Sequence, residues 1–225
     1  DDELAALASR ISPAIIIVDP DFPDRLTGID GIGLLSRHGL MDLVEGAEPP
    51  EPEWDMSGEE TAIELFTSGT TGEPKAALLR HRHLVSYVLG SVEFMGAHED
   101  EAALVSVPPY HVAGIAAILS NVYAGRRVVQ LPTFDAGDWV ALVRAESVTS
   151  AMVVPTMLTR IVEVLDAEGP DGPGLQTLRS LSYGGGRMPS PTIQRALELL
   201  PTTAFVNAYG LTETSSTVAL LGPDD

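Results

Sequence analysis

The beginning of the chain changes from a helical to an extended pattern of apolar residues. The first apolar positions recur at helical spacing and predict a short amphipathic helix that stops near Pro13. Residues 14–18 form a continuous, mainly β-branched run that ends at Asp19-Pro20, which predicts a strand buried on both faces. The helical positions are Leu4, Leu7, Ala8 and Ile11.

From residue 61 onward, short apolar runs alternate with stretches of helical periodicity. Short strands that alternate with helices are typical of parallel sheets whose two faces are covered. We therefore expect an α/β fold with a mainly parallel sheet and helices on both faces. Ligands of such sheets bind at the carboxyl ends of the strands. The predicted strands are 62–66, 103–107, 127–131, 150–154, 179–182 and 204–207, and the predicted helices are 82–95, 111–123, 137–146, 156–167 and 190–199.

Residues 19–60 lie between these two patterns and are rich in proline, glycine and acidic residues. The segment Glu48-Pro49-Pro50-Glu51-Pro52 is the extreme case. Such composition is typical of a surface connection. We expect residues 1–60 to form the edge of a first subdomain plus this connection, and residues 61–225 to form an α/β subdomain.

The composition is that of a folded globular protein. The 225 residues are 44% hydrophobic, with a mean hydropathy of +0.15. The longest apolar run, at 112–119, contains Gly114 and is far too short to cross a bilayer. With no cysteine, disulfides, thiolate metal sites and nucleophilic thiols are excluded. These features fit a cytoplasmic protein.

The net charge of -19 argues against nucleic acids and anionic membranes as partners. Binding to such surfaces depends on patches of lysine and arginine. An acidic protein that binds a polyphosphate must offset its own field with a divalent cation and a few well-placed positive side chains. An acidic metal ligand is therefore expected beside any phosphate site.

The segment Thr67-Ser68-Gly69-Thr70-Thr71-Gly72-Glu73-Pro74-Lys75 has the chemistry of a phosphate-binding loop. Glycines let the backbone approach an anion, hydroxyls donate hydrogen bonds and lysine supplies a compact positive charge. The spacing of Gly69 and Gly72 is not that of a Walker A loop, which disfavours a Ras-like or kinase-like protein. The alternative is a polar turn without function.

Two further segments follow predicted strands. In Tyr183-Gly184-Gly185-Gly186-Arg187, the glycines leave a flat backbone surface for a planar ring, and Arg187 could reach an anion. The alternative is a glycine-rich turn into a helix near Pro189. In Asn207-Ala208-Tyr209-Gly210-Leu211-Thr212-Glu213, the tyrosine could stack on a base, the threonine could contact phosphate and the glutamate could bind magnesium. The alternative is a Tyr-Gly turn with an ordinary exposed glutamate.

The histidines carry weaker signals. His111 lies in Pro108-Pro109-Tyr110-His111-Val112-Ala113-Gly114, before an apolar helix. A lone histidine beside an apolar face is more often a packed core residue than a catalyst. We expect His81 and His83 to be surface residues at a helix start, because they lack the spacing and carboxylate partner of a zinc site. No Gly-x-Ser-x-Gly hydrolase elbow is present.

These segments, in this order and at these separations, resemble the motifs of the adenylate-forming superfamily. That superfamily comprises acyl- and aryl-CoA synthetases, luciferases and the adenylation domains of nonribosomal synthetases. Residues 67–75 resemble its phosphate loop, 109–114 its acyl-pocket motif, 184–188 its adenine-contacting segment and 207–213 its Tyr-Gly-x-Thr-Glu motif. The similarity extends over essentially the whole chain, and the first 60 residues are the least diagnostic.

The resemblance implies nucleotide-binding roles for three of these segments. Residues of the phosphate loop would hold the β- and γ-phosphates of ATP, and Tyr209 would stack on adenine. The loop residues implied are Thr67, Ser68, Gly69, Thr70, Thr71, Gly72 and Lys75. The other nucleotide-binding residues implied are Gly184, Gly185, Gly186, Arg187, Asn207, Ala208, Tyr209, Gly210 and Thr212.

The resemblance also assigns the chemistry. Catalysis would depend on Lys75, on Thr212 at the α-phosphate and on Glu213 as the magnesium ligand. His111 would gate the carboxylate pocket. Arg187 departs from the family pattern, which often has proline there, and the following methionine stands where leucine is common. This departure concerns the fine contacts to adenine.

The implied reaction is activation of a carboxylate by ATP and magnesium, followed by transfer of the acyl group to the thiol of coenzyme A. The segment at 109–114 resembles that of fatty or aromatic acid ligases, so we expect an acyl-CoA ligase of fatty acid metabolism. Two alternatives stay open: an adenylation domain that loads a carrier protein, and a non-catalytic nucleotide-binding scaffold. Few residues follow Glu213, and the lysine-bearing C-terminal domain of the family is absent from the sequence. We therefore expect the chain to be an incomplete enzyme with little or no activity by itself.

The whole assignment requires that the strand-end turns converge on one triphosphate. The turn that bears Lys75 must therefore lie close to the turn that bears Glu213.

Overall fold

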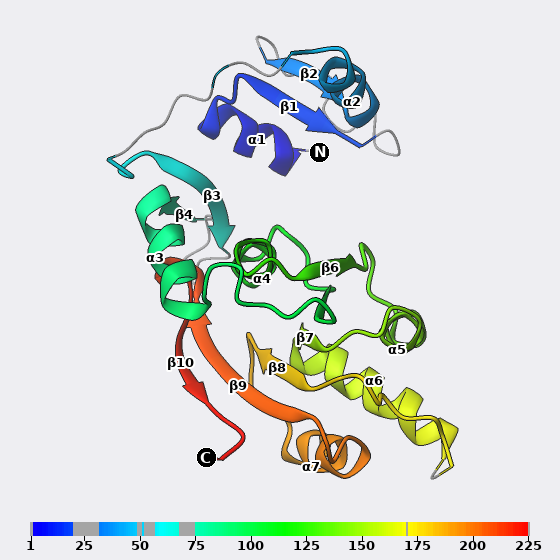
Figure 1. Cartoon of the computed structure of the whole chain (residues 1–225). Helices are drawn as coiled ribbons and strands as arrows, with labels where there is room; N and C mark the ends of the chain where they lie inside the picture. Colours follow the sequence, from blue (N-terminus) through cyan, green and yellow to red (C-terminus); the bar gives the residue numbers. More distant parts are fainter. Residues whose placement is uncertain are drawn as a thin grey trace. The chain divides into compact units, whose positions relative to one another are not determined.

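The computed structural model describes residues 2–19, 32–48, 51, 57–67, 75–169 and 171–224. The chain divides into two compact units, Asp1–Trp54 and Asp55–Asp225 (Figure 1). No helix in these described ranges is long and apolar enough to cross a membrane.

The first unit contains a parallel pair of short strands and two helices. Helix α1 is Asp2–Ile11, strand β1 is Ile15–Val18, strand β2 is Gly33–Ser36 and helix α2 is Arg37–Glu45. The Ser36 hydroxyl caps α2, accepting a hydrogen bond from the backbone N–H of Gly39 at 2.9 Å. The helix predicted at the start of the chain is confirmed.

Two expectations for this region are wrong. The strand at 15–18 is not buried on both faces, since Ile15 and Ile17 are 59% and 54% exposed. Because Ile15 and Ile17 point to the same face of the strand, that face has no covering layer among the described residues. Residues 19–60 are not only a connection, because β2 and α2 lie within them. These two elements were not predicted because their apolar residues are few and lie within a segment rich in proline and glycine.

The second unit is built on a six-stranded sheet with the order β10-β9-β8-β7-β5-β6. All its pairings are parallel except that of β10 with β9. The expected α/β fold with a mainly parallel sheet is therefore confirmed. The strands are β5 (Ala102–Val105), β6 (Arg127–Gln130), β7 (Ser150–Val153), β8 (Ser180–Gly184), β9 (Ala204–Leu211) and β10 (Ser216–Leu221).

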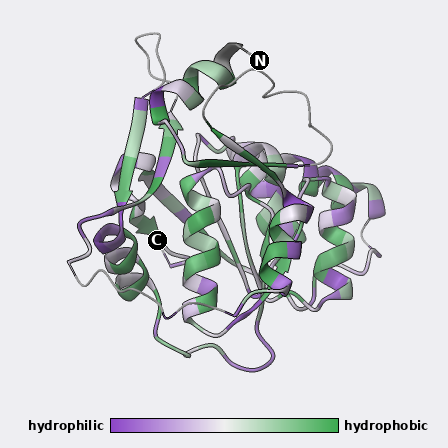
Figure 2. Ribbon diagram, turned by 90° about the horizontal axis from the view of Figure 1, so that it is seen from above, coloured by the Kyte–Doolittle hydropathy of each residue, from purple (hydrophilic) through white to green (hydrophobic). Residues whose placement is uncertain are grey.

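Helices cover both faces of this sheet, as predicted. Helices α5 (Ala136–Ala145), α6 (Pro155–Glu168) and α7 (Ser190–Leu199) pack on one face. Their core surrounds Trp139 and Leu181, both fully buried. Helices α3 (His81–Ser91) and α4 (Val112–Tyr123) lie at the opposite face, where α4 contacts β5, β6 and β10. In Figure 2 the helices carry both hydrophobic and hydrophilic residues along their lengths, as expected of helices with one buried side.

A hairpin outside the six-stranded sheet corrects the prediction for residues 61–80. Strand β3 (Thr61–Thr67) pairs antiparallel with β4 (Lys75–Arg80) in a sheet of their own. The expected strand at 62–66 therefore exists, but it is not part of the parallel sheet. Strand β4 was not predicted because its apolar residues are alanines and leucines, without the β-branched residues typical of strands. Ala77 and Leu79, which alternate along it, are buried.

The end of the chain also differs from the prediction. Strand β9 continues to Leu211, so most of the segment at 207–213 is strand and not turn. The turn is the short 3-10 helix η1, Thr212–Thr214, and the chain then returns as β10, which was not predicted.

Candidate functional site

Two glycines permit close contact between the carboxyl ends of β8 and β9, and between the end of β9 and the start of β10. Gly184 ends β8 beside Ala208 of β9, and a Cβ atom on Gly184 would lie 2.3 Å from the carbonyl oxygen of Ala208. On the other side, a Cβ atom on Gly210 would lie 1.9 Å from the carbonyl oxygen of Ser216 in β10. Real Cβ atoms do not approach backbone this closely. Only glycine permits these strands to come together, and the segments at 184–187 and 207–213 lie side by side as a result.

Several of the residues expected to bind a nucleotide are exposed at these strand ends. Tyr209 is 61% exposed on β9, which leaves the face of its ring available for stacking. Gly185 and Gly186 are exposed after β8 and approach the start of α6 at Val154 and Pro155. Gly185 has a φ of +79°, a conformation that favours glycine. Arg187 follows them and is exposed, and α7 begins at Ser190 as predicted.

Turn η1 is closed by the Thr214 side chain. Its hydroxyl accepts a hydrogen bond from the backbone N–H of Leu211 at 2.9 Å and contacts the carbonyl oxygens of Leu211 and Ser216 at the same distance. The next two residues have left-handed backbone, with φ of 58° at Ser215 and 111° at Ser216. Both are buried, at 7% and 6% exposed. Non-glycine residues rarely adopt such φ values, and strain of this kind concentrates at functional sites.

The strand that starts at Lys75 lies against this turn, since β4 contacts η1. The expected loop residues Ser68, Gly69, Thr70, Thr71 and Gly72 lie outside the described residues. The two residues that flank the loop are described and pair with each other. The Thr67 hydroxyl donates to the carbonyl oxygen of Lys75 at 3.4 Å. The base of the loop and η1 therefore belong to neighbouring elements of one unit.

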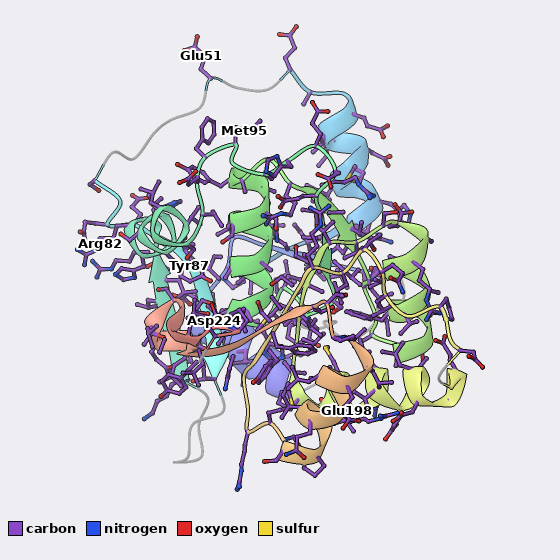
Figure 3. All side chains as sticks on the ribbon, turned by 60° about the horizontal axis from the view of Figure 1, so that its bottom comes forward. Glu51, Arg82, Tyr87, Met95, Glu198 and Asp224 are labelled. Atoms are coloured by element: carbon purple, nitrogen blue, oxygen red, sulfur yellow. The ribbon has the colours of Figure 1, made fainter. Side chains whose placement is uncertain are left out.

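Lys75 and Arg187 stand out among the positive side chains. Lys75 is the only lysine in the sequence. Most arginines are held in ion pairs, such as Arg126 with Glu101 and Arg144 with Glu168. Figure 3 labels Arg82 and Glu198, which take part in two other pairs at the surface. In the described ranges, the lysines and arginines without an ion pair are Lys75, Arg160 and Arg187.

Glu213 is exposed on η1 and is free to act as a metal ligand. Among the residues that the structure describes, no group of three or more His, Cys, Asp or Glu side chains could hold a metal by itself. Mg²⁺ commonly binds through one or two carboxylates plus substrate phosphates, so a single exposed carboxylate beside a phosphate site fits its preferences.

His111 is not a packed core histidine. It precedes α4 as an exposed residue, and its ring lies 4.8 Å from that of Tyr110. The backbone around it is tightly packed, because a Cβ atom on Gly114 would lie 2.3 Å from the carbonyl oxygen of Pro108. His81 and His83 start α3 as expected. His81 is exposed, and the half-buried His83 accepts a hydrogen bond from the backbone N–H of Arg80 at 3.3 Å.

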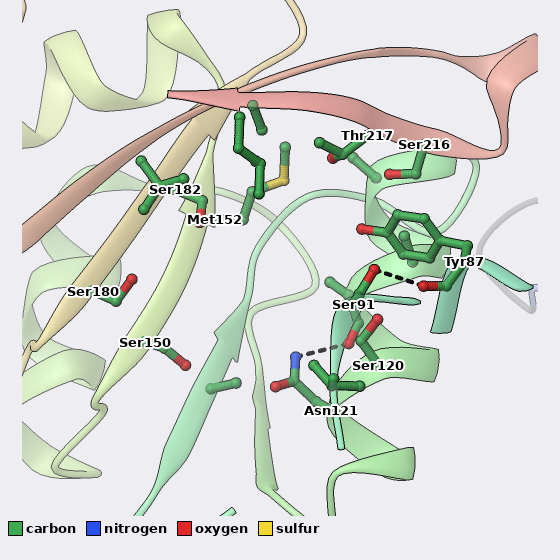
Figure 4. Close-up of a pocket in the computed structure, with 18 of the residues that line it drawn as sticks. Tyr87, Ser91, Ser120, Asn121, Ser150, Met152, Ser180, Ser182, Ser216 and Thr217 are labelled. Atoms are coloured by element: carbon green, nitrogen blue, oxygen red, sulfur yellow. Dashed lines mark hydrogen bonds between the residues drawn. The ribbon is translucent and has the colours of Figure 1, made fainter. Parts of the chain in front are cut away.

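A cavity of about 710 Å³ lies between α3, α4 and the face of the sheet. Figure 4 shows serines from β7 and β8 on one side and polar residues of α3 and α4 on the other. Ser182 lines it just before the glycine segment at 184–187, Ala208 lines it from within the segment at 207–213, and Ser216 lines it just after η1. Sequence reasoning missed this set and the role of Thr214. The serines at 180 and 182 do alternate with Leu181, which is the signal that could have indicated a polar sheet face.

Comparison with known proteins identifies the family. The model of the family described as AMP-binding enzyme matches residues 4–225. The chain belongs to this family. The match confirms the resemblance drawn from the motifs.

Several relatives of known name and structure resemble the chain. The 2-succinylbenzoate–CoA ligase of Bacillus cereus is 31% identical over 189 residues, which are 83% of this chain and 38% of that enzyme. The enzyme of the same name from Bacillus licheniformis is 32% identical over 187 residues, 82% of this chain and 37% of the relative. O-succinylbenzoate coenzyme A synthetase from Bacillus subtilis, in complex with AMP, superposes with a TM-score of 0.82 at 27% identity over 99% of this chain and 44% of that one. The chain therefore spans less than half the length of each of these relatives.

Proposed function

We propose that the protein activates a carboxylic acid with ATP, forming an acyl-adenylate, and then transfers the acyl group to coenzyme A. One observation carries this proposal. The glycine segment after β8, the exposed Tyr209 of β9 and the Glu213 turn lie side by side, and the strand that starts at Lys75 lies against that turn. This is the convergence that a triphosphate site requires.

The residues present supply the parts of such a site. Tyr209 would stack on adenine above the glycine backbone at 185–186, and Thr212 would donate a hydrogen bond to the α-phosphate. Lys75 would offset charge on the β- and γ-phosphates, in a chain whose other cations are mostly neutralised. Glu213 would hold Mg²⁺, which when bound neutralises phosphate charge.

The proposed reaction has two steps, adenylation of the acid and transfer of its acyl group to the thiol. A carboxylate oxygen of the substrate attacks the α-phosphorus of ATP, the bond to the bridging oxygen breaks, and pyrophosphate leaves. The thiolate of coenzyme A then attacks the acyl carbonyl carbon, and AMP leaves. Fixed donors and positive charges stabilise the charge that develops on the phosphoryl oxygens. His111, exposed at the start of α4, would stand at the entrance for the carboxylate.

The names of the relatives bear on the substrate. Those enzymes are ligases of 2-succinylbenzoate, an aromatic carboxylate, and they give no support to a role in fatty acid metabolism. We infer that an aromatic or similarly compact acid is the better candidate.

Transfer to a carrier protein instead of coenzyme A stays a prediction, and thioester formation measured with each acceptor distinguishes the two. The inactivity expected of these 225 residues alone also stays a prediction, which ATP–pyrophosphate exchange on the isolated chain measures.

The single lysine allows a direct test of the nucleotide site. An ATP acyl-phosphate probe transfers its acyl group to a lysine amine held near the phosphates. We expect mass spectrometry to find the label on Lys75, and excess Mg·ATP to prevent the labelling. Tyr209→Ala should weaken that protection, because the ring that stacks on adenine is lost. Arg160→Ala, which removes an unpaired cation on α6, is the matched control and should leave protection unchanged. Labelling that ATP does not reduce would contradict the proposed site.

A further inference from the structure

The cavity between α4 and the sheet carries serine hydroxyls that have no hydrogen-bond partner in the described part of the chain. Ser150 and Ser180 are direct neighbours on β7 and β8, and Ser182 follows on the same face of β8. None of these three hydroxyls makes a hydrogen bond to any described residue. Ser120 of α4 lies on the opposite wall, and its hydroxyl is fully buried without a partner.

Much of the remaining lining is apolar, and its other polar side chains come from α3, α4 and β10. Of these, Ser91 and Asn121 already donate hydrogen bonds to backbone carbonyl oxygens of their own helices. Ala113, Ala116 and Ala117 of α4 face Ala208 and Met152 of the sheet. Arg126 also lines the cavity, but its guanidinium donates to Glu101 at 2.7 Å and to Asn121. The positive charge on this wall is therefore already neutralised.

The position of the cavity connects it to the proposed site of adenylate formation. Ser182 stands two residues before Gly184, and Ala208 stands next to Tyr209. Ser216 and Thr217 of β10 line the cavity directly after η1, which carries Thr212 and Glu213 (Figure 4). A carboxylate placed at the strand ends would therefore have the rest of its molecule inside this cavity.

We propose that the cavity binds the body of the acid substrate, and that the serines at 150, 180 and 182 select an acid whose body carries uncharged oxygen groups, such as a ketone or hydroxyl, over a plain hydrocarbon. The inference rests on the proposed function and names the substrate class of that same site. Its physical basis is the cost of an unmatched polar group. An apolar body would cover the hydroxyls without giving them partners, whereas a carbonyl or hydroxyl oxygen restores the hydrogen bonds they would lose.

The three serine hydroxyls also predict how strongly the protein prefers an acid with a matching oxygen over one without it. Sites that hydrogen-bond a polar group of the substrate reject the analogue that lacks it far more strongly than apolar pockets reject a change of one methylene. We expect a preference of about tenfold or more per matched oxygen, from the cost of leaving a buried polar group unpaired.

ATP–pyrophosphate exchange on the complete gene product tests this with two acids of nearly equal size. In 4-oxo-4-phenylbutanoate a ketone replaces one methylene of 4-phenylbutanoate, so the ratio of their kcat/KM values isolates one oxygen. We expect the ketone acid to be preferred by about tenfold or more in the unmodified protein, and the ratio to fall towards unity in a triple variant with Ser150→Ala, Ser180→Ala and Ser182→Ala. Ser182→Ala provides a second, single variant at the serine nearest the strand end, for which we expect a partial fall.

Ser190→Ala is the matched control, because Ser190 starts α7 and does not line the cavity. It should leave the ratio unchanged. Equal use of the two acids by the unmodified protein, or a ratio that survives in the folded triple variant, would overturn the inference while leaving carboxylate activation intact. Absence of exchange with every carboxylic acid tried, together with ATP-independent labelling of Lys75, would overturn the proposed function and this inference with it.

Discussion

Gly114 and Gly90 occupy helices but differ in what surrounds them. A Cβ atom on Gly114 of α4 would lie 2.3 Å from the Pro108 carbonyl oxygen and 2.7 Å from that of Val107. The same atom on Gly90 of α3 would meet nothing within 4 Å. The first glycine lets the segment with His111 fold back onto its own helix, whereas the second has no such steric requirement.

This contrast predicts opposite effects of one substitution. Gly114→Ala should destabilise the protein by about 1–3 kcal/mol, because the backbone must move to relieve the collision. Gly90→Ala should stabilise it by about 0.5–1 kcal/mol through helix propensity. Urea unfolding followed by circular dichroism measures both. Equal effects of the two substitutions would show that the close approach at Gly114 does not constrain the fold.

At the residue scale, the sequence predicted the types of side chain at the strand ends but not the backbone that holds them. Tyr209 and Glu213 were expected to be available to a ligand, and both are exposed. The left-handed conformation of Ser215 and Ser216 could not be predicted, because serine has no local preference for it. The two residues lie where β9 turns back to pair with β10, so the conformation belongs to the turn and not to the residue type.

At the scale of elements, Thr214 is the residue that shapes the turn between β9 and β10. Thr214→Val keeps the size of the side chain and removes its three contacts to Leu211 and Ser216. Because this region is partly exposed, we expect a stability loss of only about 0.5 kcal/mol. We expect a larger effect on function, with the KM for Mg·ATP in pyrophosphate exchange raised about tenfold, because Thr212 and Glu213 lose their fixed positions.

Thr214→Ser is the control for this prediction, because it retains the hydroxyl. It should restore most of the affinity for Mg·ATP. Unchanged KM in the valine variant would mean that the turn is held by strand pairing alone.

The ion pair between α5 and α6 predicts an acid-dependent part of the stability. Arg144 donates two hydrogen bonds to the Glu168 carboxylate, at 2.7 and 2.6 Å, and a third to the carbonyl oxygen of Gly174 at 3.0 Å. Hydrogen bonds from Arg144, helped by its charge and opposed by burial, lower the pKa of Glu168 from its usual 4.5. A lowered folded pKa stabilises the protein above the usual pKa, and this contribution is lost as the pH falls through the folded value.

Glu168→Gln should therefore cost about 1 kcal/mol at about pH 7, and the difference from the unmodified protein should shrink towards about pH 3. Urea unfolding across this pH range measures the change. Glu146→Gln breaks a more exposed pair with Arg127 and should cost less at every pH. A cost for Glu168→Gln that is independent of pH would indicate that packing, and not the charge, is what the carboxylate contributes.

The order of strands and helices in the second unit was largely predictable from the sequence. The two strands that were not predicted, β4 and β10, show where local sequence is not sufficient. Runs such as 103–107 and 150–154 are short, apolar and separated by helices, a pattern typical of the buried strands of a parallel sheet. The apolar residues of β4 are alanines and leucines, which have no strong preference for strands, and β10 begins with serine and threonine. Both become strands through pairing with a neighbour, β3 or β9, which the local sequence does not reveal.

At the scale of the whole molecule, the charge distribution sets how a nucleotide approaches. The chain has a net charge of -19, and most of its arginines are paired with carboxylates. The field around it is therefore repulsive to ATP except close to the few unpaired cations such as Lys75. Raising the ionic strength from about 0.01 M to about 0.15 M shortens the screening length from about 30 Å to about 8 Å. The long-range repulsion is then screened more strongly than a contact at the site.

We therefore expect the association rate of Mg·ATP to rise a few-fold over this range of salt, the reverse of the fall seen where opposite charges steer association. Stopped-flow fluorescence with a labelled ATP analogue measures this rate. Adenosine, which shares the base and ribose but carries no charge, is the matched control and should show no change. An association rate of Mg·ATP that falls with salt would mean that local positive charge around Lys75 and Arg187 dominates the approach. The negative surface would then have no kinetic effect on nucleotide binding.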